Sequence, residues 1–397
     1  MRVPAFVDTH FHLSWTARSN IELNLKEVKT VKEVLEKVKE EDERGGTYGG
    51  WIIGSLLYFK IGRSLNRWLL DEVTSLPTSI ATRDGHMAIA NSKAIEIANV
   101  KCGHPGVECE EGVPTGRFFD DAMLLLRSKM PDPPVKKLYQ AYRKVLDELY
   151  RNGFLQIHAM TSRWFEWEIV KKMGHKVEVI PYMRSDSFVR GAPGVKLFVD
   201  GVFLYGTAMV NGKGRLMTPK EEIVKWLKRA EEENFKVALH VMGDEALDLV
   251  IEAYEEAGKP KGRMRIEHAA VTRDDQLEYL AEEEIPVSVQ PGIVDSVGLE
   301  DMKALLGPLW NRFMRVKDMM EYGVKVYHGS DSPVGPWRLK DVLKYYKALS
   351  KPLDLEEVVK LMSTGWEIHG GEPRAYVEVL DDGEVIVGDE LARKAER

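Results

Sequence analysis

The chain contains eight short apolar segments, most of them separated by segments of helical periodicity, and this alternation constrains the fold more than any other feature. The candidate strands are residues 3–10, 154–159, 176–183, 194–200, 236–242, 263–269, 286–290 and 324–330. Helical patterns cover residues 134–151, 165–174, 219–234, 244–257, 273–284, 315–322, 338–349 and 354–363. Such alternation through mostly short links is typical of parallel βα units. Eight strands of this kind can close so that each pairs on both sides, which predicts an α/β fold, a (β/α)8 TIM barrel.

Residues 20–130 interrupt the alternation of strands and helices. A helix is expected over roughly 29–43, where Val34 and Val38 lie on one apolar stripe. Gly-rich turns and further short segments follow. We interpret 20–130 as an insertion after the first strand that caps the mouth of a barrel spanning 1–370.

The tail of the chain has the pattern of a β-hairpin. Apolar and polar residues alternate from Tyr376 to Val387 around an Asp-Gly pair that ends at Gly383. An isolated hairpin is marginally stable in water. We therefore expect this one to pack on the barrel or on a partner chain.

Composition narrows the class of protein. The 397 residues are 44% hydrophobic and 30% charged, with a net charge of -7 and no stripe of Lys or Arg. Nucleic acid and anionic membranes are therefore not expected partners. No apolar stretch reaches the about 18 residues of a membrane span, and the first residues lack a signal-peptide pattern, so we expect a cytoplasmic protein. Abundant Lys and Glu with few Gln and Cys favour a heat-adapted source.

Two cysteines, Cys102 and Cys109, leave three interpretations open: free thiols, a loop disulfide or a weak metal pair. Disulfides are rare in reducing compartments, and no secretory signal precedes the first strand. Free thiols are the expectation.

The first candidate strand ends in the sequence Asp8-Thr-His10-Phe-His12. Side chains alternate along a strand, so His10 and His12 point the same way. Two imidazoles on one face can reach one metal ion at about 2.0–2.1 Å. The pair alone also fits two ordinary histidines at a strand end, so its meaning depends on the other candidate ligands.

Four later candidate strands carry or end in a potential ligand: Lys196, His240, His268 and Asp331. A (β/α)8 barrel gathers its chemistry at the C-terminal ends of its strands. Taken singly, each histidine could be a core residue, Lys196 a salt-bridged lysine and Asp331 a turn residue. Together with His10 and His12 they predict a site for zinc or a similar divalent ion.

Lys196 is the unusual member of this set, because a protonated lysine is repelled by a dication. Burial and nearby positive charge make the neutral amine accessible. A neutral amine can add carbon dioxide to become an anionic carbamate that bridges two metals. Two ions would acidify a bound water and polarise a carbonyl, with Asp331 taking and passing on the proton. The predicted reaction is metal-assisted hydrolysis.

With these residues laid out, the chain resembles the amidohydrolase superfamily, and within it the amidohydrolase family 3 branch. The matching stretches are FVDTHFHL, NLKEVKTVKEVLE, RDGHMAIANSKA, PTGRFFDDA, GVKLFVDG, LHVMGDEALD, RIEHA, VSVQP and YHGSDSPV. The resemblance implies a (β/α)8 barrel with a metal centre that hydrolyses C–N bonds in amides or cyclic amides. It also implies six site residues: His10, His12, His240 and His268 as ligands, Lys196 as the carboxylated lysine, and Asp331 as ligand and general base.

The resemblance has three departures. Relatives usually carry several strands ahead of the HxH strand, which pair with C-terminal strands in a small β-sandwich. Residues 371–397 would then be the remnant of that domain on a truncated chain, with its hairpin repacked or poorly ordered. The residues after Gly201 lack the small, Arg-containing stretch common in relatives, and those after Trp51 lack an acidic residue often found there.

Four further residues are weaker substrate candidates. His86 lies in an Asp-Gly-His motif of the insertion that matches a recurrent family histidine, with a local cap as the alternative. His158 and Gln290 end the second and seventh candidate strands. Arg117 could pair with a substrate carboxylate or lie at the surface. His369 falls near a helix end and receives no role.

Three functions remain open at this level. The first is a binuclear metal hydrolase with two zinc ions, although manganese, cobalt or iron would also suit the ligands. The second is a mononuclear deaminase-type enzyme with unmodified Lys196, and the third is a non-catalytic metal-binding barrel. We expect a small-molecule substrate, and a homo-oligomer is possible.

Overall fold

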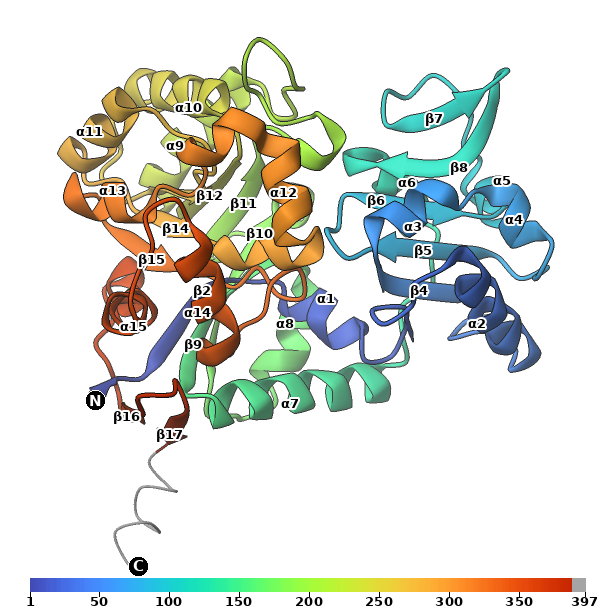
Figure 1. The fold of residues 1–397 in the computed structure, drawn as a ribbon, viewed down its shortest axis with the longest axis horizontal. Coiled ribbons are helices and arrows are strands. Elements are labelled where there is room, and N and C mark those ends of the chain that lie inside the picture. The colour runs from blue at the N-terminus through green and yellow to red at the C-terminus, as the bar shows by residue number, and fades with distance from the viewer. Residues whose placement is uncertain (388–397) are drawn as a thin grey trace, which may run out of the picture. The chain divides into compact units, whose positions relative to one another are not determined.

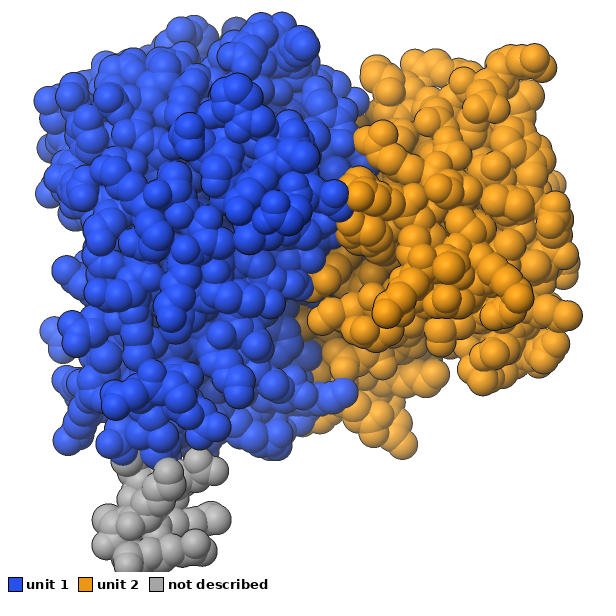
Figure 2. Space-filling model, in the orientation of Figure 1, with its two compact units in different colours: residues 1–14, 143–397 blue, residues 15–142 orange. Residues whose placement is uncertain are grey.

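The computed structural model describes residues 1–387 and divides the chain into two compact units. One unit comprises residues 1–14 together with the chain from Arg143 onward, and the other comprises residues 15–142 (Figure 2). The expected insertion, 20–130, lies within the second unit. The expected capping of the barrel mouth stays a prediction.

The first unit is built on an eight-stranded parallel sheet with the order β15-β14-β13-β12-β11-β10-β9-β2 (Figure 1). Its strands are β2 (Phe6–Phe11), β9 (Phe154–Ser162), β10 (Glu178–Arg184), β11 (Gly194–Phe198), β12 (Lys236–Val241), β13 (Met264–His268), β14 (Val287–Val289) and β15 (Val326–His328). Neighbouring strands are parallel throughout. The predicted barrel is confirmed, and most residues of its eight strands are buried, as parallel strands between helices and core are expected to be.

The ring closes between its two end strands through the residues that follow β15. The backbone N–H of Asp331 donates to the carbonyl of His10 at 2.7 Å, and the N–H of His12 donates to the carbonyl of Ser332 at 3.0 Å. Phe11 and Ser332 form a parallel bridge. Closure therefore brings the end of β2, which carries the HxH motif, next to the segment after β15, which carries Asp331.

Helices follow most of the barrel strands, as predicted. They are α7 (Val135–Arg151), α8 (Trp164–Lys171), α9 (Lys220–Glu233), α10 (Asp244–Glu256), α11 (Asp274–Glu282), α13 (Val316–Glu321), α14 (Leu339–Ala348) and α15 (Leu355–Ser363). Sequence patterns missed α12 (Leu299–Leu306), which follows β14. Only the 3-10 turn Ser185–Ser187 and a loop connect β10 to β11.

The first predicted strand, 3–10, is two strands in the structure. β1 (Arg2–Pro4) pairs with the tail, and β2 begins at Phe6. The chain changes partners at this point, because Ala5 N–H donates to Ala375 whereas Phe6 N–H donates to Gly153. Pro4 has no N–H to continue a ladder.

The predicted tail hairpin is present as β16 (Tyr376–Val379) and β17 (Val385–Val387). It forms an antiparallel three-stranded sheet with β1, in the order β1-β16-β17. Val377, Val379 and Ile386 are buried. The hairpin is thus packed within the first unit, which answers how a marginal element of this kind is stabilised. The residues after 387 in the predicted remnant lie outside the described part of the chain.

The second unit is a mixed sheet with the order β3-β4-β5-β6-β8-β7. Its strands are β3 (Leu23–Asn24), β4 (Ile52–Leu57), β5 (Thr78–Thr82), β6 (Met87–Ala90), β7 (Val107–Glu110) and β8 (Val113–Phe119), accompanied by α2 (Val31–Glu43), α3 (Phe59–Ser64), α4 (Arg67–Asp71), α5 (Ser92–Ala98) and α6 (Met123–Arg127). The predicted helix at 29–43 is α2. Thr30 caps it by accepting from Glu33 N–H, and Val34 and Val38 are fully buried.

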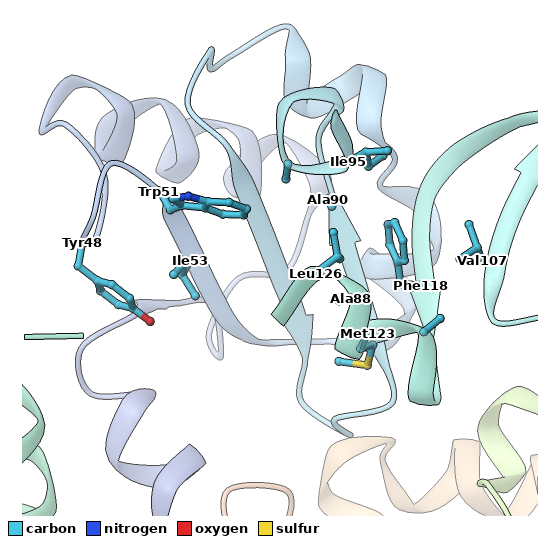
Figure 3. Packing of buried hydrophobic residues seen from close by; sticks show 12 residues of the cluster. Tyr48, Trp51, Ile53, Ala88, Ala90, Ile95, Val107, Phe118, Met123 and Leu126 are labelled. Carbon is cyan, nitrogen blue, oxygen red and sulfur yellow. The ribbon is translucent and has the colours of Figure 1, made fainter. Parts of the chain in front are cut away.

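The core of this second unit is apolar. Trp51, Ile53, Phe118, Met123 and Leu126 belong to one buried cluster (Figure 3). Burial of such side chains from water supplies the main favourable free energy of folding.

The expectation of free thiols is wrong, because Cys102 and Cys109 form a disulfide. Cys109 lies on β7, and Cys102 lies in the turn that leads into this strand. Their Cα atoms are 6.2 Å apart, within the range that a disulfide spans. The expectation rested on how rarely disulfides occur in reducing compartments, whereas the structure brings these two particular cysteines within bonding distance.

In the described part of the chain, helices are too short or too polar to cross a bilayer.

Candidate metal centre

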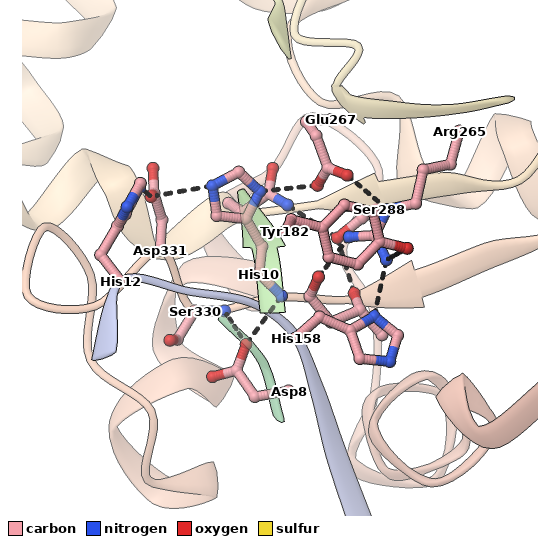
Figure 4. Close-up of polar contacts among 12 residues, drawn as sticks. Asp8, His10, His12, His158, Tyr182, Arg265, Glu267, Ser288, Ser330 and Asp331 are labelled. Carbon is pink, nitrogen blue, oxygen red and sulfur yellow. Dashed lines mark hydrogen bonds and ion pairs between the residues drawn. The ribbon is translucent and has the colours of Figure 1, made fainter. Parts of the chain in front are cut away.

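Two histidines at the end of β2 and a carboxylate after β15 form the centre of the site. The Oδ1 atom of Asp331 lies 3.2 Å from Nε2 of His10 and 3.0 Å from Nε2 of His12 (Figure 4). One potential ligand atom from each residue lies within 4.8 Å of the others. This spacing suits three ligands around a single cation.

Three other predicted ligands lie beside this trio. The ring of His268 is centred 5.0 Å from that of His10 and 4.5 Å from that of His240. Nζ of Lys196 lies 5.4 Å from the centre of the Phe198 ring, and Phe198 is in ring contact with His240. Ring contacts thus join the four predicted histidine ligands, and all six predicted residues lie in barrel strands or in the loops that follow them.

The backbone is left-handed at two of these positions. His268 has φ 73°, and Asp331 has φ 58°. Residues with a Cβ seldom adopt this conformation, and such backbone outliers cluster at functional sites. At both positions the backbone therefore departs from strand geometry, so each side chain points in a different direction from that in a continuing strand.

Close packing also limits the chain at Gly329, between β15 and Asp331. A Cβ placed there would lie 2.5 Å from Cβ of His10 and 3.0 Å from the amide nitrogen of Gln290. Only glycine lets the eighth strand end approach the first so closely.

Two nitrogen atoms of the site are buried without a hydrogen bond from the described residues to compensate for their loss of water. Within residues 1–387, Nζ of Lys196 and Nδ1 of His268 have no hydrogen-bond partner. Lys196 is 2% exposed and His268 3% exposed. Buried polar atoms are normally satisfied, and a bound ion is one reason for an exception. Imidazole nitrogens and a carboxylate are the ligands that zinc and similar ions take, so the residues present fit a divalent metal.

The charges of the site are shaped mainly by burial. Burial lowers the pKa of Lys196 to about 8, which makes its neutral amine accessible near neutral pH. Burial, with the neighbouring His240, keeps the pKa of His268 well below its ordinary value, so this imidazole is neutral and can act as a ligand. Burial would raise the pKa of Asp331, but His10 and His12 outweigh it and hold that pKa well below the usual range.

A second layer of buried charge lies against His10, and the sequence analysis gave it no role. Oε2 of Glu267 is 2.6 Å from Nδ1 of His10, and Oε1 of Glu267 accepts from Nε of Arg265 (Figure 4). Burial would raise the pKa of Glu267, but Arg265 and His10 hold it well below the usual range. The available signal was two charged residues, two positions apart, that alternate with the apolar Met264 and Ile266.

The weaker substrate candidates in the first unit have mostly internal partners. His158 lies inside the barrel, fully buried, with Nδ1 2.6 Å from Nη1 of Arg265. The amide of Gln290 donates to Oγ of Ser288 at 2.8 Å, and its Oε1 has no hydrogen-bond partner among the described residues. Gln290 keeps an acceptor available beside the trio, whereas His158 does not face it directly.

The two candidates in the second unit have local partners. Nδ1 of His86 pairs with Oδ1 of Asp120 at 2.8 Å. The guanidinium of Arg117 pairs with Glu108 and donates from Nε to the carbonyl of Leu65 at 2.9 Å. Their substrate roles stay predictions.

An open groove of about 540 Å³ lies elsewhere on the first unit, beside α8 and the start of β10. Trp167, Val170, Ile180 and His369 are among the residues that line it. None of the predicted ligands does. The groove is therefore separate from the chemistry described above.

Comparisons with known proteins identify the family of this chain. Residues 1–365 match the model of the amidohydrolase family. Among curated proteins, a putative amidohydrolase of Bacillus subtilis is 23% identical over 84% of this chain and 70% of its own length. An N-substituted formamide deformylase of Arthrobacter pascens is 25% identical over 86% of this chain and 72% of its own.

Two solved structures of metal-dependent hydrolases are also similar to this chain. An uncharacterised metal-dependent hydrolase of Pyrococcus furiosus superposes with a TM-score of 0.68 and 26% identity, covering 91% of this chain and 81% of that one. A second, from Pyrococcus horikoshii, has a TM-score of 0.71 and 23% identity over 96% and 86% of the two chains, and it supports the fold.

Proposed function

This chain belongs to the amidohydrolase family, and from that membership we propose that it is a metal-dependent hydrolase that cleaves a C–N bond of an amide or cyclic amide. The family accounts for hydrolysis of amide-type bonds in general, and the residues present fit a divalent metal. The type of bond, the number of ions and the roles below are our proposal.

The contact of Asp331 with both histidines of the HxH motif carries the proposal. Its Oδ1 lies 3.2 Å and 3.0 Å from their Nε2 atoms, although Asp331 is more than three hundred positions from both histidines in the chain. A cluster of two imidazoles and one carboxylate, nearly excluded from water, is the arrangement that binds a divalent ion and keeps one carboxylate beside it.

Asp331 acts as the general base in this proposal. Bound divalent metal would supply a polarised carbonyl and an acidified water. The carboxylate of Asp331 is ionised, because His10 and His12 hold its pKa well below the usual range. It accepts a proton from the attacking water and returns it to the leaving nitrogen.

Lys196 supports a binuclear form with two zinc ions. Its buried neutral amine adds to carbon dioxide by forming an N–C bond and losing a proton, which gives a carbamate anion. The product carries two oxygens in a position where the lysine had a single unpartnered nitrogen. The positive charge that would repel a dication is replaced by a negative charge.

A mononuclear, deaminase-type site is the alternative, and one observation favours it. Within the described residues, only His10, His12 and Asp331 meet the spacing of metal ligands. In that case Lys196 stays unmodified and the enzyme binds one ion.

N-substituted formamides are the first substrates to test, because one relative is named a deformylase of that class. We propose a small-molecule substrate, with the free Oε1 of Gln290 as a contact. His86, His158 and Arg117 remain the further candidates for substrate binding.

The test is a hydrolysis screen of formamides, linear amides and cyclic amides. Protein reloaded with zinc and bicarbonate is compared with chelator-treated protein. Asp331→Asn is the inactivating variant, and Asp318→Asn is its matched control, since Asp318 pairs with Arg315 and Lys351 on the outside of the barrel. We expect activity that requires metal, persists in Asp318→Asn and is lost in Asp331→Asn. Equal turnover by the metal-free protein would refute the proposal.

A further inference from the structure

A charged pair is buried inside the barrel next to the HxH motif. Arg265 and Glu267 are two residues apart on β13, so their side chains share the face that points into the barrel. They are 1% and 0% exposed. Removing two charges from water costs several kcal/mol per ion, and a buried pair is weak evidence of a stabilising role. Its position against His10 suggests another reason for its presence.

We propose that Glu267, anchored by Arg265, is a positioning residue that accepts a hydrogen bond from Nδ1 of His10 and so fixes the ring with Nε2 facing Asp331. This inference rests on the proposed function only for what Nε2 would bind. The proton on Nδ1 of His10 can be measured without metal or substrate.

The contacts of Glu267 determine the proton on His10. Oε2 of Glu267 lies 2.6 Å from Nδ1 of His10, and its other oxygen accepts from Arg265. An ionised carboxylate can only accept, so Nδ1 of His10 must donate. With Nδ1 held by Glu267, Nε2 is the ring atom that faces Asp331.

Arg265 is held by all three of its nitrogens. Nε donates to Glu267, Nη2 donates to the carbonyl of Thr9, and Nη1 lies 2.6 Å from Nδ1 of His158. The guanidinium also lies 4.8 Å from the centre of the Tyr182 ring. Because the guanidinium is planar and fork-shaped, lysine could not reproduce these bonds.

The same contacts give His158 a role in support of Arg265. Arginine is always a donor, so Nδ1 of His158 accepts, and Nε2 of His158 donates to Oε1 of Gln156 at 3.2 Å. Tyr182, which packs on Arg265, is 2.9 Å from Nε2 of His369. His10, Glu267, Arg265 and His158 thus form one chain of buried partners.

His12 shows that this device is specific to His10. Nδ1 of His12 lies 3.1 Å from the hydroxyl of Thr161, whose own proton is donated to the carbonyl of Met160 at 2.8 Å. The hydroxyl therefore accepts from Nδ1, and His12 also directs Nε2 at Asp331. A neutral hydroxyl therefore orients His12, whereas a charged carboxylate orients His10.

The experiment is made on the full chain in metal-free form. Nitrogen NMR of 15N-histidine-labelled protein, with His10 assigned from its absence in His10→Gln, should show Nδ1 protonated at neutral pH. Glu267→Gln places an amide between two donors, so one bond is lost, and the Nδ1 signal of His10 should shift toward that of an unprotonated nitrogen. Zinc affinity, measured by competition with a chromophoric chelator, should fall about 10- to 100-fold.

Glu283→Gln is the control for a Glu-to-Gln change. Glu283 pairs with Lys259 at 2.7 Å, just after α11, and lies outside the chain of partners that leads to His10. Its substitution should leave the His10 signals and zinc affinity unchanged. If Glu267→Gln does not fold, the wild-type spectrum still decides, because an unprotonated Nδ1 on His10 would overturn the inference. A wild-type protein with Nδ1 of His10 protonated that binds no zinc would leave this inference standing and refute the proposed function.

Discussion

The two compact units bury different kinds of side chains. The second unit is centred on an apolar cluster that includes Trp51, Phe118 and Leu126. The interior of the barrel instead holds Lys196 and the Arg265–Glu267 pair beside its histidines. Apolar burial stabilises a fold in proportion to the area removed from water, whereas buried charges cost free energy unless well paired. The comparison indicates that one interior is built for stability and the other for chemistry.

The largest effect is expected from a change that leaves the barrel folded. Asp331→Asn removes the proposed base with little change in volume, so turnover should fall by about 10²- to 10⁴-fold. The measurement is kcat on the substrate found by the screen, alongside the thermal unfolding midpoint. Turnover within tenfold of wild type would show that the carboxylate is not the base. Asp318→Asn, on α13, controls for an Asp-to-Asn change away from the ligands.

The opposite result is expected in the second unit. Phe118 is fully buried in the apolar cluster. Phe118→Ala should cost about 3–5 kcal/mol of stability, because it removes apolar contacts and leaves a cavity. The measurement is urea unfolding followed by fluorescence, with metal content measured on the folded fraction. Metal content per folded chain should not change, and a loss of metal would mean that the two interiors are not functionally distinct.

Lys196→Met tests whether a buried charge is held at the expense of stability. The substitution replaces an unpartnered buried amine with an apolar side chain of similar length. Metal-free protein should gain about 1–3 kcal/mol of stability. Metal content should fall from two ions per chain toward one. A destabilised variant would indicate that Lys196 has a structural role, and Lys220→Met, on the surface of α9, is the control for the substitution itself.

The smallest effect concerns pH. Burial lowers the pKa of His328 to about 3, below its value of about 6.5 in an unfolded chain. A lowered folded pKa leaves its contribution intact above pH 6.5, and that contribution is lost as the pH falls from 6.5 toward 3. At pH 5.5 the loss is about 1.4 kcal/mol. His328→Gln should reduce the drop in unfolding free energy between pH 7.5 and 5.5 by this amount, and an unchanged drop would contradict the assignment.

Much of the barrel could be predicted from sequence, because parallel strands buried on both faces appear as continuous apolar runs. The division of the first run between β1 and β2 could not, since it depends on partners as distant as Ala375. Helix α12 was missed, and the disulfide was mispredicted from a compartment average rather than from the local approach of the two cysteines.

The candidate site, like the fold, could be predicted from sequence only in part. Spacing along strands is a local property, so the positions of His10, His12 and Asp331 at strand ends could be inferred. The partners that fix their protons could not, because Glu267 reaches His10 across the barrel from a strand 257 residues away. His86 and Arg117 were predicted from sequence motifs as substrate contacts, whereas the structure shows the local partners that each of them has within the second unit.

The central proposal is that this barrel holds divalent metal at the HxH motif and Asp331. The most direct measurement is elemental analysis of protein purified without chelator, combined with intact mass under non-acidic conditions. The account predicts about two ions per chain and an added mass of about 44 Da, that of one carbon dioxide on Lys196. One ion with no added mass would favour the mononuclear site. Absence of metal even after reconstitution with zinc and bicarbonate would contradict the account.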